Sequence, residues 1–470
     1  MVTALQASAY YPPVNFGGTE VYVSGLVRAL KSFGVASTVV APLAPAQPDG
    51  YRYDDTTVRT YPAGAGLARQ GRAADSAGAA DDAIARFRDV LAEVRPDIYH
   101  QHSWTPALGL WHLRAARQAG VPTVVTVHVA GVTCMRGTLM RFGTEVCDGR
   151  IDPLTCAACW NNERGVPKLV AEGLAALSAK FGGFARKALP PSSLTTALTS
   201  TLRAEAMREN LLMLADSADR IVAVCQWLYD VLLLNGVPRE KLVLCRQGID
   251  GAFASSLAAL SGAPERDLPG RHDTQQAAPA RFRLIFLGRW QRLKGIDTLV
   301  RAVQALPQAA PIVLSIHCVG DGEEERAYQA AVRSLIGDDR RIVIAPPVPR
   351  VDLARALEEA DALAVPSRCL ETGPLVVLEA KAAGLPVIGS RVGGIAELVR
   401  ESDDGVLVPV DDTAAWSEAI SAMMQRVNKP RRSPASAPRT MADVAAEMAA
   451  LYAELCRMSP SRQEVRCASR

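Results

Sequence analysis

Two glutamates and two cations in the C-terminal half of the sequence are of types suited to holding a phosphorylated substrate. Glu371 lies in a loop after an apolar run, and Glu379 follows with seven residues between them, inside a segment predicted to be helical. Arg289 and Lys294 follow another apolar run. Arginine grips phosphate oxygens bidentately and lysine acts as a point charge, so these cations would offset a diphosphate. Taken alone, these cations would more often belong to a solvated surface loop.

The loop before Glu379 also predicts a helix start that favours anions. Pro374 suits the first turn of a helix, so the backbone N–H groups of Leu375 and Val376 would point out of its N-terminus. The helix dipole there favours a negative charge. Glu379 would accept hydrogen bonds from vicinal hydroxyls such as those of a ribose, and Glu371 would lie beside whatever is attached to the far end of the phosphates. No GxxxxGK[ST] motif is present, so a P-loop nucleotide hydrolase is a poor match.

A second group of candidate ligands consists of four cysteines in the N-terminal half. Cys134, Cys147, Cys156 and Cys159 have the spacing C-x12-C-x8-C-x2-C. Four thiolates at such spacing most often bind structural zinc and less often an iron–sulfur cluster. The alternative is four unrelated thiols. We expect a structural zinc site as a hypothesis that metal analysis of the purified protein would test.

The elements that position these residues alternate between short apolar runs and helical patterns. This rhythm predicts parallel sheets with helices on both faces, and therefore an α/β fold with two Rossmann-like, doubly wound domains facing each other across a cleft. The predicted segments are an N-terminal domain (1–250) with a Cys-rich insertion (129–165), a linker (251–281), a C-terminal domain (282–427) and a last helix (440–457) that could pack back on the first domain. Ligands of open parallel sheets bind outside the carboxyl ends of the strands.

Composition excludes several classes of protein. The 470 residues carry 52 Lys and Arg and 49 Asp and Glu, a net charge of 52 − 49 = +3, which gives no reason to expect a nucleic-acid partner. The first residues do not resemble a signal peptide, and no apolar run approaches the ~18 residues of a membrane span. We therefore expect a cytoplasmic protein, or one attached peripherally to the inner face of a membrane.

One segment, 166–189, bears on that second alternative. Its Leu and Phe residues alternate with Lys168, Lys180, Arg186 and Lys187. Such a stripe more often faces a protein core. The other interpretation is a basic amphipathic helix lying on an anionic membrane.

Taken together, these motifs resemble the retaining glycosyltransferases of the GT-B fold, family 4 (glycosyl transferases group 1). The resemblance is carried by "GRWQRLKG", by the E-x7-E of Glu371 and Glu379, and by "VIGSRVGGIAELV" followed by "GVLVPVDD". The N-terminal "YYPPVNFGGTE", "DIYHQHSW", "VVTVH" and the "GID" ending at Asp250 fit the same family in the same order, over about residues 7–412. Many relatives have Glu-x-Phe-Gly where this chain has "ETGP", so the donor preference does not carry over.

The resemblance implies roles for individual residues. Arg289 and Lys294 would bind the donor's diphosphate and stabilise the leaving group, Glu379 would hold the ribose, and Glu371 would contact the transferred sugar. The residues implied in donor binding are Arg289, Lys294, Glu379, Gly373, Leu375, Val376, Gly17 and Gly18, and those implied in catalysis are Glu371, His128, Arg289 and Lys294. No cofactor is implied for catalysis, because Arg, Lys and helix dipoles would stabilise the diphosphate.

The expected function is transfer of a hexose, with retention, from a nucleotide-diphosphate sugar to a saccharide or polyprenyl-linked acceptor. Such a reaction belongs to the synthesis of cell-surface polysaccharides or glycolipids. Retention could come from front-face attack or, with lower weight, from a covalent intermediate on Glu371. The alternatives are a sugar-nucleotide epimerase on the same fold and a degenerate, non-catalytic sugar-binding or scaffold protein.

Overall fold

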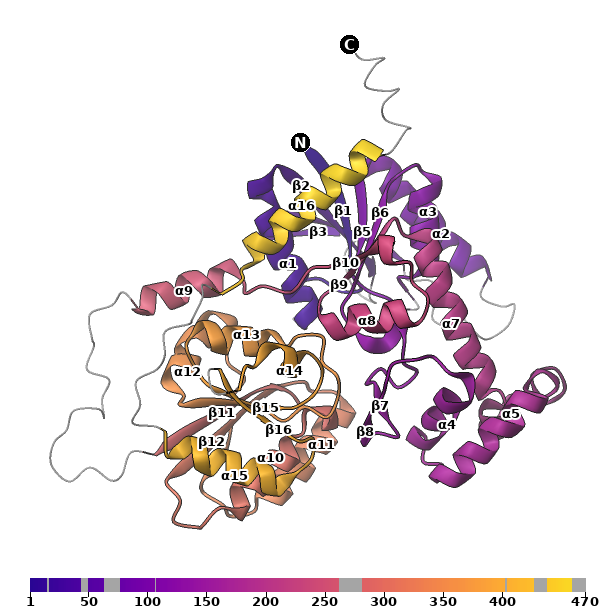
Figure 1. The fold of residues 1–470 in the computed structure, drawn as a ribbon. Coiled ribbons are helices and arrows are strands. Elements are labelled where there is room, and N and C mark those ends of the chain that lie inside the picture. The colour runs from indigo at the N-terminus through magenta and orange to yellow at the C-terminus, as the bar shows by residue number, and fades with distance from the viewer. Residues whose placement is uncertain are drawn as a thin grey trace. The chain divides into compact units, whose positions relative to one another are not determined.

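The computed structural model describes residues 1–14, 17–43, 50–62, 77–105, 107–261, 281–401, 404–426 and 438–458. Its internal contacts divide the chain into two units, Met1–Gln247 with Met441–Arg470, and Gly248–Thr440. Each unit is an α/β domain with its own largely or wholly parallel sheet (Figure 1). The predicted fold class of two doubly wound domains is confirmed.

The first unit is built on an eight-stranded sheet in the spatial order β10-β9-β6-β5-β1-β2-β4-β3. Neighbouring strands pair in parallel, except that β3 and β4 are antiparallel. Successive side chains of a strand point to opposite faces, so Ala4 and Leu5 of β1 contribute to different cores. The strands are β1 (Val2–Ala7), β2 (Val35–Leu43), β3 (Gly50–Tyr53), β4 (Thr56–Pro62), β5 (Ile98–Gln101), β6 (Thr123–Val127), β9 (Arg220–Ala223) and β10 (Leu242–Leu244).

Helices cover both faces of this sheet. One face packs against α2 (Ala77–Val94), α3 (Leu110–Gln118), α7 (Ser200–Ser217) and α8 (Gln226–Leu234), and the other against α1 (Gly18–Leu30) and α16 (Met441–Met458). Helix α16 comes from the far end of the chain and lies beside α1 (Figure 1). Its buried residues recur every three or four positions, which is the period of a one-sided helix.

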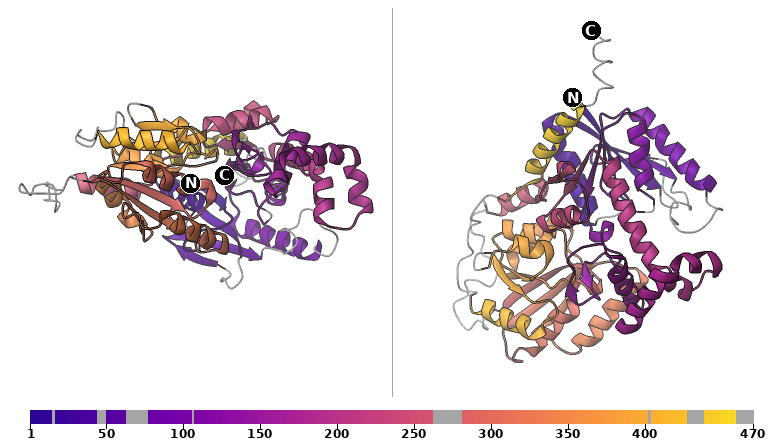
Figure 2. Two further views of the ribbon diagram at one scale, coloured as in Figure 1. Left: turned by 90° about the horizontal axis from the view of Figure 1, so that it is seen from below. Right: turned by 45° about the vertical axis from the view of Figure 1, so that its right-hand side comes forward.

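A helical insertion follows β6 in the first unit. It contains the hairpin β7 (Met140–Arg141) and β8 (Glu145–Val146) and the helices α4 (Pro153–Glu163), α5 (Lys168–Ala188) and α6 (Ser193–Leu198). Asp152 caps α4 by accepting a hydrogen bond from the Thr155 N–H, and Pro153 occupies its first position. Figures 1 and 2 show α4 and α5 beside each other at the edge of the first unit, beyond the strands of its sheet.

The second unit is built on a six-stranded, wholly parallel sheet in the order β13-β12-β11-β14-β15-β16. Its strands are β11 (Phe282–Arg289), β12 (Ile312–Val319), β13 (Ile342–Ala345), β14 (Ala362–Val365), β15 (Val387–Ser390) and β16 (Gly405–Val408). Helices α10 (Ile296–Ala305), α11 (Glu323–Ile336) and α15 (Thr413–Met424) share one core with the sheet. Helices α9 (Gly251–Ser261), α12 (Leu353–Glu359), α13 (Leu375–Ala382) and α14 (Gly393–Leu398) share the other.

Two expectations from the sequence need correction. Residues 251–261, assigned to a linker, form α9, which packs on α12 because Phe253 is apolar and buried; residues 262–280 lie outside the described part of the chain. The large apolar side chains of 166–189 do not face a core, as Leu169 and Phe184 are 81% and 70% exposed. Among the described helices, none is both long and apolar enough to cross a bilayer.

Candidate active site

The loops that carry the predicted phosphate-binding residues meet at one point of the second sheet. From β11 the chain proceeds to β12 and β13 on one side, and then to β14, β15 and β16 on the other. The strand order therefore reverses between β11 and β14, and ligands of open α/β sheets bind at such a switch point. Arg289 ends β11, Lys294 lies in the short 3-10 helix Arg292–Lys294 that follows, and Glu371 lies in the loop after β14.

The structure brings Lys294 and Glu371 into direct contact. The Nζ atom of Lys294 donates to Oε1 of Glu371 at 2.8 Å, and the hydroxyl of Ser367 donates to the same oxygen. Burial alone would lower the pKa of Lys294, but the charge and hydrogen bond of Glu371 outweigh it, so that its pKa is raised and the amine stays protonated. A positive charge is therefore fixed at the switch point, with a carboxylate beside it.

Two glycines allow the loops around this pair to approach each other closely. Gly295 has a φ of +66°, and a Cβ there would lie 1.9 Å from the carbonyl oxygen of Pro366 in the neighbouring loop. A Cβ on Gly394, at the start of α14, would lie 2.4 Å from the backbone nitrogen of Gly373. The backbone N–H of Gly394 also donates to the carbonyl of Glu371 at 2.6 Å. Neither position has room for a side chain, so the backbone around Glu371 is held from two sides.

Arg289 and Glu379 have partners of their own. The guanidinium of Arg289 is 44% exposed and lies 4.0 Å from the carboxylate of Glu325 on α11. Glu379 is buried, which raises its pKa, and it forms an ion pair with Arg350, which opposes that shift. Arg350 was not singled out from the sequence, because one arginine in a polar loop carries no distinguishing signal.

The predicted helix start is present, one residue later than expected. Pro374 is the N-cap of α13 rather than part of its first turn, and Leu375 and Val376 are the first two helical residues. Their N–H groups have no acceptor within the helix, as in any first turn. Gly373, with a φ of +110°, turns the chain into the helix. These groups lie in the same loop as Glu371, but whether they hold phosphate stays a prediction.

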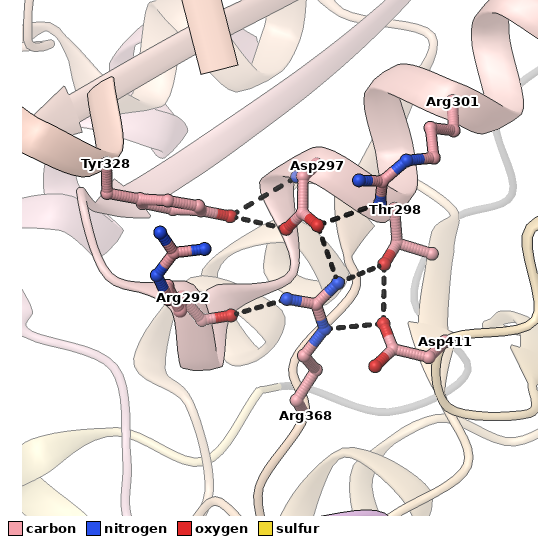
Figure 3. Close-up of polar contacts among 7 residues, drawn as sticks. All are labelled: Arg292, Asp297, Thr298, Arg301, Tyr328, Arg368 and Asp411. Atoms are coloured by element: carbon pink, nitrogen blue, oxygen red, sulfur yellow. Dashed lines mark hydrogen bonds and ion pairs between the residues drawn. The ribbon is translucent and has the colours of Figure 1, made fainter. Parts of the chain in front are cut away.

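A residue that the sequence did not indicate ties these loops together. The guanidinium of Arg368 donates to Asp297 at 2.9 Å and to Thr298 at 2.7 Å, both at the start of α10, and to the Arg292 carbonyl at 3.1 Å (Figure 3). It also donates to Asp411 after β16. Burial would raise the pKa of Asp297, but hydrogen bonds from Arg368 and Tyr328 and the charge of Arg368 lower that pKa well below its usual value. Arg368 thus fixes three loops of the switch point to one another.

The first unit has its own switch point, between β1 and β5, and a cluster of buried histidines lies there. His102 follows β5, and its Nε2 lies 2.8 Å from Oε1 of Gln6 in β1. The Nδ1 of His102 lies 3.3 Å from Nε2 of His128, which follows β6. Because the Gln6 oxygen only accepts, a neutral His102 carries its proton on Nε2 and accepts from His128 Nε2–H. In the same unit, Gly17 is the N-cap of α1 and Gly18 is its first residue.

His100 extends this network to the end of the chain. Its Nδ1 lies 2.5 Å from the hydroxyl of Tyr452 on α16, and its Nε2 lies 2.7 Å from the hydroxyl of Thr126. Burial lowers the pKa of His100 and of His128 to about 3, and that of His102 also falls well below its usual value. All three imidazoles are therefore neutral at physiological pH. His128 occupies its predicted place after "VVTV", and its role at the reacting sugar stays a prediction.

The four clustered cysteines converge around the β7–β8 hairpin and α4. All four thiols are free and partly exposed, and the N–H of Phe142 in the hairpin turn donates to the Cys159 sulfur at 3.2 Å. Burial, and then the nearby Cys134, Cys147 and Cys159, raise the pKa of Cys156 to about 12. As these side chains lie, no three His, Cys, Asp or Glu residues in the described ranges are grouped to hold a metal ion. Zinc at this cluster therefore stays a prediction.

Family models match both units. Residues 281–426 match the model described as "Glycosyl transferases group 1", and residues 17–248 match the model described as "Glycosyl transferase 4-like domain". The switch point of the second sheet, with Arg289, Lys294 and Glu371, lies within the first of these matches. The three histidines lie within the second match, which begins after β1.

Individual proteins are similar over shorter stretches. A D-inositol 3-phosphate glycosyltransferase of Xylanimonas cellulosilytica is 34% identical over 38% of this chain and 44% of its own length. A D-inositol 3-phosphate glycosyltransferase 1 of Catenulispora acidiphila is 33% identical over 44% of this chain and 49% of its own length. The chain thus spans less than half the length of these two curated relatives.

Two solved structures share the fold over the whole chain. Sucrose-phosphate synthase from Thermosynechococcus elongatus superimposes with a TM-score of 0.58 at 20% identity, and both chains are covered completely. Anabaena HepE, solved in complex with UDP and glucose, superimposes with a TM-score of 0.57 at 14% identity, again over both complete chains. At these identities the likeness concerns the fold alone.

Proposed function

The chain belongs to the glycosyl transferases of group 1, and from this membership we propose that it transfers a sugar from a nucleotide-diphosphate sugar to a saccharide or polyprenyl-linked acceptor. The observation that carries the proposal is the Lys294–Glu371 ion pair at the switch point of the second sheet. A fixed cation beside a carboxylate, next to a helix start, suits a ligand with a diphosphate at one end and a polyhydroxylated ring at the other.

In this proposal, each group at the switch point acts on a different part of the donor. Lys294 and Arg289 contact the diphosphate, and the first N–H groups of α13 complete its anion site. Glu371 accepts hydrogen bonds from hydroxyls of the transferred sugar. Glu379 accepts a hydrogen bond from the ribose. Burial raises the pKa of this carboxyl group, and the ion pair with Arg350 opposes that rise.

The chemical step follows from where the charge develops. As the bond between the anomeric carbon and the phosphate oxygen breaks, positive charge grows on the sugar ring and negative charge on the diphosphate. Lys294 and Arg289, already in place, stabilise that negative charge in the transition state more than in the ground state. We propose that the acceptor hydroxyl attacks from the face that the phosphate leaves and gives its proton to the leaving phosphate oxygen, which retains the anomeric configuration.

The first experiment is calorimetric titration of the whole chain with UDP-, GDP- and ADP-sugars and with the free diphosphates. We expect at least one of them to bind, and Arg289→Ala to weaken that binding by about tenfold or more. Arg355→Ala is the matched control, because Arg355 is an exposed arginine of the same unit that pairs with Glu359 on its own helix. Absence of binding to every nucleotide would overturn the proposal.

The second experiment follows the sugar itself. With the binding donor, acceptors are tested as a saccharide set, a polyprenyl phosphate sugar, and inositol 3-phosphate, the last because curated relatives carry that name. The anomeric configuration of the product is determined by NMR, and inversion would contradict the proposed step. Epimerisation of the donor in the absence of any acceptor would instead identify an epimerase, and binding without turnover would identify a non-catalytic protein.

A further inference from the structure

Helix α5 presents its small residues to the protein and its large apolar residues to solvent. Its buried residues are Ala171, Ala175, Ser178, Gly182 and Ala185. Their packing against the neighbouring helices is close: a Cβ on Gly182 would lie 3.1 Å from the Leu198 carbonyl oxygen. The face that α5 turns to the protein is therefore fixed by contacts that larger side chains would prevent.

The opposite side of α5 carries an apolar surface, which we call the α5 face. It consists of Leu169, Val170, Leu177, Phe181 and Phe184, which are between 48% and 81% exposed. At about 100° per residue these five side chains fall within an arc of about 120°. Single exposed apolar residues are ordinary, but five on one side of one helix mark an interaction surface.

The charges on the same helix indicate what the α5 face meets. Helix α5 contains the cations Lys168, Lys180, Arg186 and Lys187 and one acidic residue, Glu172. By the same helical geometry, Lys180 and Lys187 lie along the Leu169 edge of the arc. Lysine stems extend along apolar surface while their ammonium groups reach phosphate headgroups, as on helices that lie in a membrane interface.

From these observations we infer that the α5 face docks on an anionic membrane surface, with α5 lying in the plane of the headgroups. The helix has 21 residues and is not apolar enough to cross the bilayer, which suits an interfacial position rather than a spanning one. The apolar arc would enter the boundary between headgroups and acyl chains, and Lys180 and Lys187 would contact anionic lipid. This inference does not depend on sugar transfer, because it concerns where the protein binds and not what it catalyses.

The test is sedimentation of the full chain with vesicles of phosphatidylcholine alone or with added phosphatidylglycerol. Binding should be strong only with the anionic lipid and should weaken as salt increases. The pair Lys180→Glu and Lys187→Glu should reduce binding by more than about twenty-fold, since each basic residue near an anionic surface is worth about fivefold. Lys31→Glu reverses the charge of an exposed lysine on another element, and it should change binding by less than about fivefold.

A second pair of variants tests the apolar contribution. Phe184→Ser together with Leu169→Ser should reduce binding to anionic vesicles by about tenfold or more. Both side chains are exposed, so the circular dichroism spectrum and melting temperature should match those of the unchanged protein. Equal binding to both vesicle types would overturn the inference. Binding to anionic vesicles that stays unchanged in either double variant of α5 would also overturn it. The inference would also be wrong if the protein did not bind vesicles but formed a dimer that these serine changes dissociate. The α5 face would then contact a second copy of the chain.

Discussion

At the scale of single residues, the Lys294–Glu371 pair combines two requirements of the proposed chemistry. The amine must stay positive in a partly buried site, and Glu371 ensures this by raising its pKa. The carboxylate must keep one position, and Lys294 and Ser367 both donate to its Oε1. A carboxylate held in this way is suited to accept a hydrogen bond from a sugar hydroxyl. Glu371 therefore keeps Lys294 positive for the diphosphate, and Lys294 keeps Glu371 in position for the sugar.

This pairing predicts different results for changes at its two ends. Lys294→Met should weaken nucleoside diphosphate binding by about tenfold or more and lower turnover by about 10²- to 10³-fold, because it removes a preorganised cation. Glu371→Gln should lower turnover similarly but leave binding of the free diphosphate within a few-fold, since Glu371 is expected to contact the sugar. Calorimetry and steady-state kinetics measure the two quantities.

A control separates these effects from loss of stability. Lys381→Met removes another partly buried ion pair of the second unit, with Asp404 at 3.0 Å, in the last turn of the same helix α13 that Glu371 precedes. It should lower the melting temperature but leave diphosphate affinity unchanged. If Glu371→Gln weakened the free diphosphate as strongly as Lys294→Met, the separate roles assigned to the two residues would be wrong.

At the scale of elements, Arg368 connects the start of α10, the loop after β14 and the loop after β16. Arg368→Lys keeps the charge but loses the planar fork that reaches all of these partners. We expect the free energy of unfolding to fall by about 1–3 kcal/mol, and the KM for the donor to rise several-fold with a smaller change in kcat. Donor kinetics together with denaturant unfolding provide the check, and a large fall in kcat at unchanged KM would contradict this positioning role.

A feature of the fold can be predicted from the sequence when the residues that determine it lie close together in the chain, that is, when the signal is local. The alternation of strands and helices is local, and it predicts both sheets and the loops that carry Arg289, Lys294 and Glu371. The contacts of Arg368 give no such local signal, because its partners Asp297 and Asp411 lie 71 and 43 residues away in the chain. The orientation of α5 is equally hidden, because alanine and glycine pack a helix against its neighbours as well as leucine does.

The cysteine insertion gives a further prediction at this scale. If the four thiols bind zinc, the metal–ligand bonds would stabilise the loop between β6 and α4, whose own hydrophobic core is small. Elemental analysis should find about one zinc per chain, and Cys156→Ser should abolish it, whereas Cys318→Ser should not, because Cys318 is a buried cysteine of the other unit. Purified protein with neither zinc nor iron would show that the cluster is four free thiols.

At the scale of the whole molecule, helix α16 meets strands β1 and β5 within the first unit. Tyr452 on α16 lies 352 residues after His100, and the two side chains share a hydrogen bond beneath the switch point. The last helix therefore completes the support of the histidine cluster, and that support requires neutral imidazoles. Tyr452 donates to His100 Nδ1, which is possible only while that nitrogen is unprotonated, because Gln6 donates to the same tyrosine oxygen.

This neutral cluster predicts that the first unit loses stability in mild acid. Burial lowers the pKa of His100 and His128 to about 3, below the value of about 6.5 in an unfolded chain, so the unfolded state binds more protons as the pH falls through about 6.5. Each imidazole should then remove about 1 kcal/mol of unfolding free energy between pH ~7.5 and ~5.5. Calorimetric melting across this range should show the decline in stability. His100→Gln should make that decline less steep by the contribution of one imidazole.

Thr126→Val is the control, because it removes a hydrogen-bond partner of His100 but no titrating imidazole. It should lower stability at every pH and leave the steepness of the decline unchanged. A melting temperature independent of pH in this window would show that the histidines do not titrate on unfolding as proposed.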